Sequence, residues 1–86
     1  MDLRHLRYFV TVARARNLSH AAAELRVAQP ALSRQIRDLE HELGVTLLER
    51  HAKGVTPTLA GEALARFCFA KTDDDLEEAC RRLERI

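Results

Sequence analysis

The residues whose types and spacing best suit chemistry lie between Pro30 and His41, where cationic and polar side chains recur at helical spacing. On a helix of about 3.6 residues per turn, one arc carries Pro30, Arg34, Arg37 and His41. The opposite arc carries Leu32, Ile36, Leu39 and Leu43. A guanidinium offers a planar fork of N–H donors that matches phosphate oxygens or the acceptor edge of guanine. A buried rear face and an arginine-lined front face are what a helix in the DNA major groove requires.

Two helices joined by a tight turn must hold this stripe. Ser19 is predicted as the N-cap of the first helix, which continues to Leu25. Residues 26–29 are too few for more than a turn. Pro30 suits the first turn of the second helix, where its missing N–H has no cost. The pattern predicts a helix-turn-helix. Its second helix, residues 30–43, would be the recognition helix, which contacts the bases and is called the reading helix below.

A supporting helix precedes this pair, and a hairpin follows it. Apolar residues recur at helical spacing over residues 3–15. After Gly44, residues 47–50 and 55–56 are two short extended segments around a turn in which Gly54 can take a positive φ. The hairpin would be a wing that brings Lys53 and Arg50 near the minor groove or the phosphates. The alternative is a simple connecting loop.

Thr58 is predicted to cap a final helix that runs to Ile86. A heptad-like apolar seam follows it, made of Ala65, Phe69, Thr72, Leu76, Ala79, Leu83 and Ile86. A three-helix core has little surface left for so long a helix, so a two-fold partner is the better account of the seam. We therefore expect a DNA-binding domain over residues 1–58 and a linker and dimerisation helix over residues 59–86.

These segments resemble the N-terminal DNA-binding domain of LysR-type transcriptional regulators. The most specific matches are QPALSRQI at residues 29–36 and LGVTLLER at residues 43–50. Further matches are Leu3 to Val12, Ala21-Ala22, Leu25, Leu39-Glu40, Thr58 and Ala60-Gly61. The resemblance implies a mainly α winged helix-turn-helix, a three-helix core plus a short β-hairpin wing, followed by a long dimerisation helix. It also implies promoter binding, with a C-terminal effector-binding domain and frequent tetramers in full-length members.

Two residues depart from the family pattern. Ala28 stands where a serine is common, so it offers no hydroxyl to cap the reading helix or to touch a phosphate. Pro57 stands where an aliphatic residue is common, and we expect it to shorten or bend the second wing strand. Both departures concern the details of contact rather than the family.

The expected DNA contacts divide into base readers and backbone binders. Arg34 can take guanine bidentately, Gln29 can present both donor and acceptor to adenine, and Ser33 can bond a base or a phosphate. The full expected set is Gln29, Pro30, Ser33, Arg34, Arg37, Lys53, Arg50, Ser19 and Thr58. Arg37 and His41 should meet the backbone or solvent. The alternative for Arg34 and Arg37 is pairing with Asp38 or Glu40 on the helix surface, an interaction worth little. One reading helix spans few base pairs, so we expect a homodimer on inverted-repeat half-sites.

Charge and composition agree with this assignment. The net charge of +1 divides into +3 over residues 1–58 and −2 over residues 59–86, so the basic half contains the reading helix. No run of about 20 apolar residues and no signal-like start is present, so we expect a cytoplasmic protein. Cys68 and Cys80 are expected to be packing residues, because they lie too far apart on one helix for a disulfide.

Other function classes have weaker support in the sequence. An enzyme is not expected, because no nucleophile–base pair or phosphate loop has suitable spacing. No metal site or cofactor is expected, because no Cys or His pair has ligand spacing. The remaining rival is a helical protein–protein dimerisation module without DNA-binding activity.

Overall fold

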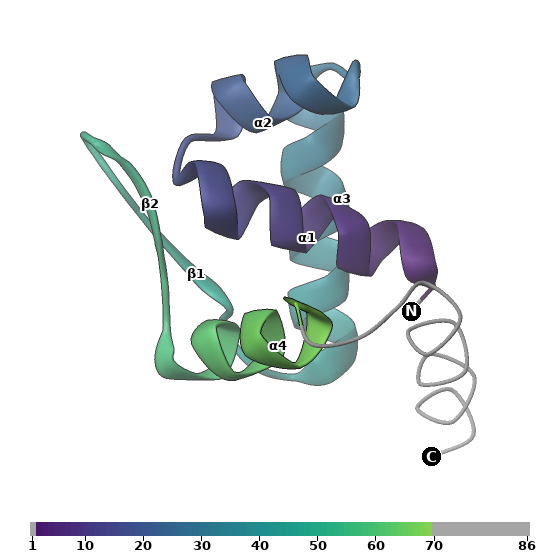
Figure 1. The fold of residues 1–86 in the computed structure, drawn as a ribbon, viewed down its shortest axis with the longest axis vertical. Helices are drawn as coiled ribbons and strands as arrows, with labels where there is room; N and C mark the ends of the chain where they lie inside the picture. Colours follow the sequence, from purple (N-terminus) through teal and green to yellow (C-terminus); the bar gives the residue numbers. More distant parts are fainter. Residues whose placement is uncertain (1, 70–86) are drawn as a thin grey trace.

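The computed structural model describes residues 2–69, which form four helices and one two-stranded antiparallel sheet (Figure 1). In chain order the elements are α1 (Leu3–Ala15), α2 (Leu18–Leu25), α3 (Gln29–Leu43), β1 (Leu48–His51), β2 (Gly54–Pro57) and α4 (Leu59–Phe69). The predicted winged helix-turn-helix is confirmed over this range. The predicted extension of α4 to Ile86, with its seam beyond Phe69 and with Cys80, lies outside the described residues.

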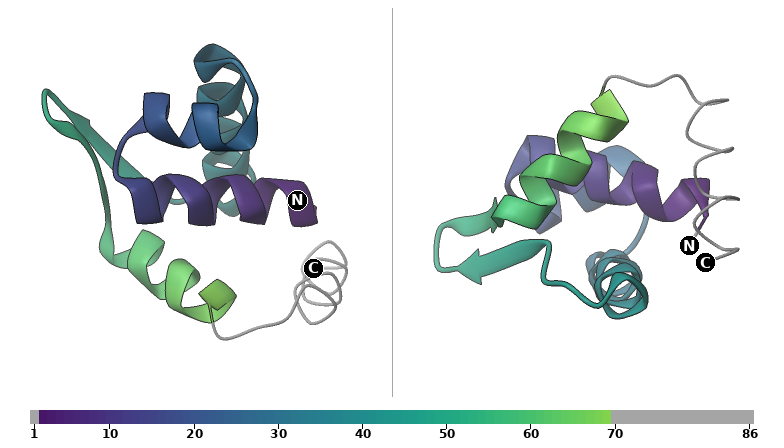
Figure 2. Two further views of the ribbon diagram at one scale, coloured as in Figure 1. Left: turned by 45° about the horizontal axis from the view of Figure 1, so that its top comes forward. Right: turned by 90° about the horizontal axis from the view of Figure 1, so that it is seen from below.

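Helix α1 begins at a reciprocal cap and lies between the other helices (Figures 1 and 2). The Asp2 carboxylate accepts a hydrogen bond from the His5 backbone N–H at 3.1 Å, and His5 Nδ1 accepts one from the Asp2 N–H at 3.3 Å. The backbone N–H of His5 lowers the pKa of Asp2, because it stabilises the charged carboxylate. The helix ends at Arg16, which has a left-handed backbone with φ +56°. Its buried face carries Leu6, Phe9, Val12 and Ala13.

Helix α2 begins earlier than predicted. Asn17, not Ser19, is its N-cap: the Asn17 backbone is extended, and its side chain accepts a hydrogen bond from the His20 N–H at 2.9 Å. The left-handed turn at Arg16 leaves Asn17 as the first residue that can cap, so Ser19 falls inside the first turn. The prediction was wrong because two good capping residues lie two positions apart.

The apolar arc of α3 is the centre of the core, as predicted. Leu32, Ile36 and Leu39 are fully buried against α1 and α2, and Leu43 is half-buried at the end of the helix. Ala21 and Ala22 are also buried, and their small side chains let α2 and α3 cross closely. Ala28 caps α3 without a side-chain hydrogen bond, as expected for an alanine there, and a proline follows in the first turn.

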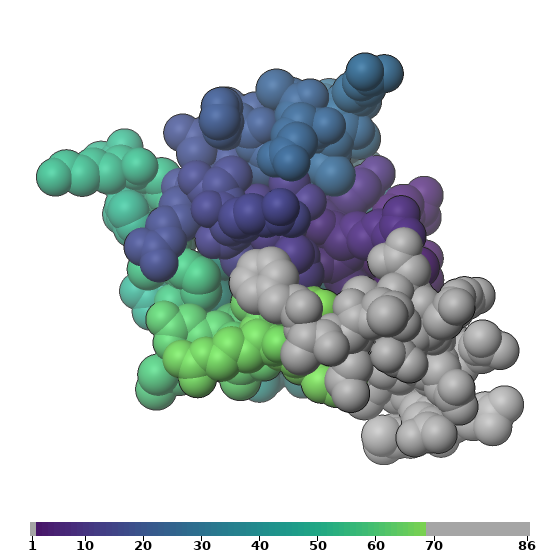
Figure 3. All heavy atoms as spheres, viewed as in Figure 1, coloured from purple at the N-terminus to yellow at the C-terminus, as the bar shows by residue number. Residues whose placement is uncertain are grey.

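The segment after α3 is a wing rather than a simple loop. β1 and β2 pair antiparallel from Leu48 opposite Pro57 to His51 opposite Gly54. The first strand therefore starts one residue later than predicted. Pro57 is the last residue of β2 and still pairs with Leu48, so the strand is not shortened ahead of the proline, and the alternative of a bend stays a prediction. The wing projects beyond the body of the helices (Figure 3).

The base of the wing is packed into the core and fixed to α1 and α4. Leu47 and Leu48 are buried, as expected for a hairpin that cannot be stable alone. The Val55 N–H donates to the Arg16 carbonyl at 3.1 Å. Thr58 caps α4 as predicted: its hydroxyl accepts from the Gly61 N–H at 3.1 Å and donates to the Thr46 carbonyl at 2.6 Å.

Candidate nucleic-acid interface

Helix α3 lies at one side of the molecule, with α1 between it and α4 (Figure 2, right). Its buried arc faces α1 and α2, so the opposite arc faces away from the protein. The residues that the sequence predicts for this outer face are exposed, apart from Ser33, which is half-buried: Gln29, Pro30, Ser33, Arg34 and Arg37. One rigid element therefore presents the whole predicted reading surface, as a major-groove helix requires.

The two arginines of this face form no ion pair with any residue of the described range 2–69. Neither Arg34 nor Arg37 pairs with Asp38 or Glu40, the alternative that the sequence left open. Glu40 is engaged elsewhere, as described below. Both guanidinium groups are therefore available to an anionic or acceptor-rich ligand.

Ser19 and Gln29 are brought together at the turn between α2 and α3. The Ser19 hydroxyl donates to Gln29 Oε1 at 3.4 Å. This contact orients the amide so that its Nε2 donors face away from Ser19. Ser19 therefore contacts the reading helix and does not act as a helix cap. To donate its hydroxyl proton to a phosphate, Ser19 would have to give up the hydrogen bond to Gln29.

The wing reaches back to α3 through a second pair of predicted residues. Arg50 on β1 donates from Nη1 to Ser33 Oγ at 2.7 Å. These residues are 17 positions apart, and the periodicity of neither element brings them together. A direct side-chain hydrogen bond therefore joins the wing to the reading helix.

The turn of the wing is stiffened by His51, which the sequence did not single out. Its Nε2 lies 2.6 Å from Thr56 Oγ1 on the other strand, and the Lys53 backbone N–H donates to its Nδ1 at 3.3 Å. A neutral imidazole with its proton on Nε2 satisfies both contacts. These contacts hold the backbone of the turn that carries the exposed Lys53.

A family model described as bacterial regulatory helix-turn-helix protein, lysR family, matches residues 3–62. The chain belongs to the LysR family. It is 53% identical over 70 residues to the Hca operon transcriptional activator HcaR of Escherichia coli strain K12, a match that covers 81% of this chain and 24% of that protein. The chain spans only 20–24% of the length of the first curated relatives it matches.

Solved LysR-family structures have the same fold. The BenM DNA-binding domain in complex with catB site 1 DNA superimposes with a TM-score of 0.77 at 47% identity, covering 81% of this chain and 75% of that one. The CbnR DNA-binding domain in its DNA complex gives a TM-score of 0.79 at 42% identity, covering 99% and 93%. The winged helix-turn-helix architecture of this LysR-family chain is therefore shown both by its own geometry and by these similarities.

Glu40 is a residue of this LysR-family domain whose contribution the sequence did not reveal. Its half-buried carboxylate oxygen Oε2 accepts from the Leu47 N–H at 2.7 Å and from the Leu48 N–H at 3.2 Å. It thereby ties the last turns of α3 to the first residue of the wing strand. One signal for Glu40 was present in the sequence, the Leu39-Glu40 pair that matches the family pattern, but nothing in the sequence indicated which groups Glu40 contacts.

We expect Glu40→Ala to destabilise the domain by about 1–3 kcal/mol, because two partly buried N–H groups would lose a charged acceptor. Glu40→Gln should lose less, because its amide oxygen can still accept. The exposed Asp38→Ala is the matched control on the same helix and should change stability by less than about 0.5 kcal/mol. Denaturant unfolding measures all three, and equal stabilities of the Glu40→Ala and Asp38→Ala variants would contradict this assignment.

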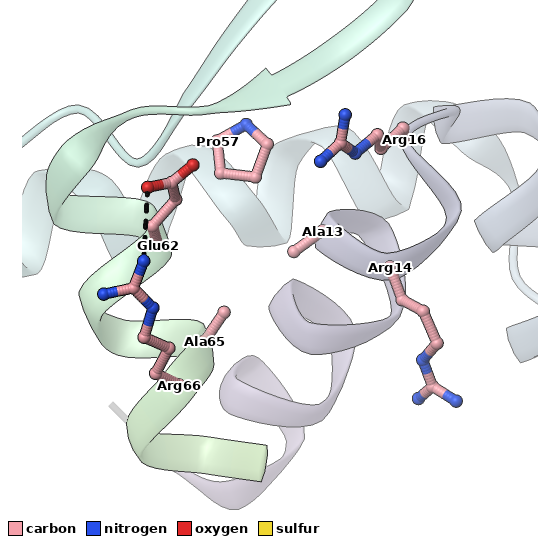
Figure 4. Close-up of a pocket in the computed structure, with 7 residues that line it drawn as sticks. All are labelled: Ala13, Arg14, Arg16, Pro57, Glu62, Ala65 and Arg66. Carbon is pink, nitrogen blue, oxygen red and sulfur yellow. Dashed lines mark ion pairs between the residues drawn. The ribbon is translucent and has the colours of Figure 1, made fainter.

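A shallow cavity of about 320 Å³ lies on another face of the molecule, between the end of α1, β2 and α4 (Figure 4). Its floor is apolar, with Ala13, Ala65 and Pro57. Glu62 and Arg66 form an ion pair at 3.8 Å along its edge. Because the cavity lies on the α1–α4 side of the molecule, its lining residues do not belong to the α3 surface (Figures 2 and 4).

The described residues add three further observations. They contain no group of three or more His, Cys, Asp and Glu side chains that could hold a metal ion. Within residues 2–69, no helix is both long and apolar enough to cross a membrane. Cys68 is a buried residue of the core, which fits the predicted packing role.

Proposed function

We propose that this chain binds double-stranded promoter DNA in a sequence-specific manner and thereby regulates transcription. The observation that carries the proposal is the outer face of α3, where Arg34 is exposed and makes no ion pair within residues 2–69, and where the exposed Gln29 lies five residues before it. Pro30 and Ser33 complete the base-reading set, with Arg37, Arg50 and Lys53 as phosphate contacts. A phosphate contact through Thr58 would require its bond to the Thr46 carbonyl to break.

The proposed assembly is a homodimer formed through the C-terminal helix, on two half-sites arranged as an inverted repeat. One reading helix covers too few base pairs for a useful specificity ratio. Two copies related by a two-fold axis read a palindromic site, with half-sites separated by whole turns of DNA. In a longer protein that carries an effector-binding domain, higher oligomers and ligand control are part of the same proposal, as is a cytoplasmic location.

The relatives support this proposal by what their names record. HcaR is an activator of the Hca operon, and the BenM and CbnR DNA-binding domains were solved with DNA. The dimerisation module without DNA binding, by contrast, gives no reason for unpaired arginines on the outer face of a rigid helix.

Selection of bound sequences from random DNA by the purified 86-residue chain tests the proposal. We expect an inverted-repeat motif to emerge, and binding to the selected site should weaken steeply as salt rises, because cationic side chains displace counterions from the phosphates. A chain that dimerises in solution and enriches no sequence would support the dimerisation module instead.

A further inference from the structure

We infer that Arg50 is a positioning residue that fixes the Ser33 hydroxyl as a hydrogen-bond donor toward DNA. The observation is the 2.7 Å contact in which Arg50 Nη1 on β1 donates to Ser33 Oγ on α3. The inference rests on the proposed function and adds to it a coupling between the wing and the reading helix. It also assigns the hydrogen-bond polarity of Ser33, that is, whether its hydroxyl donates to DNA or accepts from it.

The chemistry of the two groups decides the polarity. A guanidinium has five N–H donors and no acceptor, so Arg50 can only donate to Ser33. The serine oxygen therefore gives a lone pair to the wing, and its own O–H must point elsewhere. No acceptor within residues 2–69 takes that proton. Ser33 is half-buried on the outer arc of α3, so DNA is the acceptor that the geometry leaves for this proton.

This polarity selects among the groups that DNA presents. A hydroxyl that donates suits a phosphate oxygen, guanine O6 or N7, adenine N7 or thymine O4. The exocyclic amino groups of cytosine and adenine are donors, and the one serine lone pair left for them belongs to an oxygen that already accepts from a cation, which makes it the poorer partner. Ser33 without Arg50 would have both lone pairs and its O–H to offer, so the wing residue biases this side chain toward donation.

The rest of the wing holds Arg50 in place for this task. Glu40 fixes the start of β1 to α3 through the Leu47 and Leu48 N–H groups, and Arg50 itself pairs with Val55 in the ladder. Four N–H donors of the guanidinium remain for a phosphate once one is used on Ser33. The same side chain can therefore contact the backbone and orient Ser33 at once.

A double-mutant cycle tests the coupling. Affinity for the selected site is measured for the unmodified chain, Ser33→Ala, Arg50→Ala and the double variant at one salt concentration. We expect Ser33→Ala to weaken binding by about threefold to tenfold. The double variant should bind no more than about twofold more weakly than Arg50→Ala alone, because Ser33 acts through a geometry that Arg50 sets. Melting temperatures check that each variant is folded.

Lys53→Ala provides the matched control, since Lys53 is also a wing cation and its side chain makes no hydrogen bond with Ser33. In a Ser33→Ala/Lys53→Ala double variant, the fold-losses of affinity from the two single substitutions should multiply. If the Ser33→Ala and Arg50→Ala losses also multiply, Arg50 acts on phosphates alone and the inference is wrong. If the unmodified chain selects no sequence at all, the proposed function fails and this inference fails with it.

Modified DNA identifies the acceptor once coupling is found. Single methylphosphonate linkages remove phosphate charge, and 7-deazaguanine removes one base acceptor. At one position, the modification should weaken binding of the unmodified chain but not of Ser33→Ala. The DNA group changed at that position is the acceptor of the Ser33 hydroxyl. A position at a phosphate and a position at a base edge both agree with a donating Ser33. If the modification that weakens binding of the unmodified chain but not of Ser33→Ala is instead the removal of a cytosine amino group, Ser33 accepts from that group and the inference is wrong.

Discussion

Replacing Arg34 with alanine is expected to abolish discrimination between the selected operator and random DNA, while the domain stays folded. The guanidinium lies at the centre of the outer face of α3 and has no ion-pair partner within residues 2–69, so its donors are available to base edges. A bidentate contact of arginine with guanine discriminates by roughly 1–3 kcal/mol per half-site. In a dimer this loss applies to both half-sites, which makes it the largest effect on recognition that we predict.

The measurement is the ratio of affinities for the operator and for random DNA at fixed salt. Arg37→Ala is the matched control, because it removes the same charge one turn further along the same helix. We expect that variant to weaken binding to both DNAs alike and to reduce the salt slope by about one. Circular dichroism should show unchanged helix content for both variants, since alanine favours a helix. An unchanged affinity ratio in Arg34→Ala would refute the assignment of α3 as the reading helix.

Local patterns in the sequence predicted the parts of the fold that depend on burial. The spacing of Leu32, Ile36 and Leu39 was enough to place the rear face of α3, because an amphipathic helix has one way to bury its apolar arc. The resemblance supplied the wing, which two short extended segments could not have distinguished from a loop. The cap at Thr58 followed from residue type alone.

The wrong predictions and the missed contacts have a common physical cause. In each case the sequence offers more than one local arrangement, and contacts between different elements decide which one forms. Asn17 and Ser19 are both good caps, and the left-handed backbone of Arg16 decides between them. The first strand starts at Leu48 rather than Leu47, and the Leu47 and Leu48 N–H groups are both bound by the Glu40 carboxylate of α3. Sequence patterns report neighbours along one element, and these contacts join different elements.

The candidate interface shows the same division. The exposure of Arg34 follows from helical periodicity, and the structure agrees with it. The contacts that position the wing do not follow from periodicity: Glu40 meets the backbone after the turn, and Arg50 meets Ser33 across 17 residues. The candidates for DNA contact could be predicted from residue type and spacing, whereas the contacts that hold these candidates in place could be seen only in the fold.

The largest expected effect on stability is that of Gly54→Ala. Gly54 has φ +133°, a conformation that L residues rarely adopt, and an added Cβ would overlap the Arg16 carbonyl oxygen. Strain and overlap together should cost about 2–5 kcal/mol. Gly44→Ala is the matched control, since Gly44 has φ +71° with nothing within 4 Å of an added Cβ. It should cost about 1 kcal/mol, from backbone strain alone.

The Gly54→Ala variant can respond to the overlap in two ways, with the wing either docked or detached. Hydrogen exchange of the backbone amides distinguishes the two. If the wing stays docked, the whole domain carries the strain and the melting temperature falls by at least several degrees more than in Gly44→Ala. If the wing detaches, the Val55 N–H loses its bond to the Arg16 carbonyl and exchanges rapidly, while the amides of α1 and α3 stay protected. A detached wing would also displace Arg50 from Ser33, so operator affinity should fall by at least as much as in Arg50→Ala. Wild-type stability together with a protected Val55 amide would contradict the predicted overlap of an added Cβ with the Arg16 carbonyl.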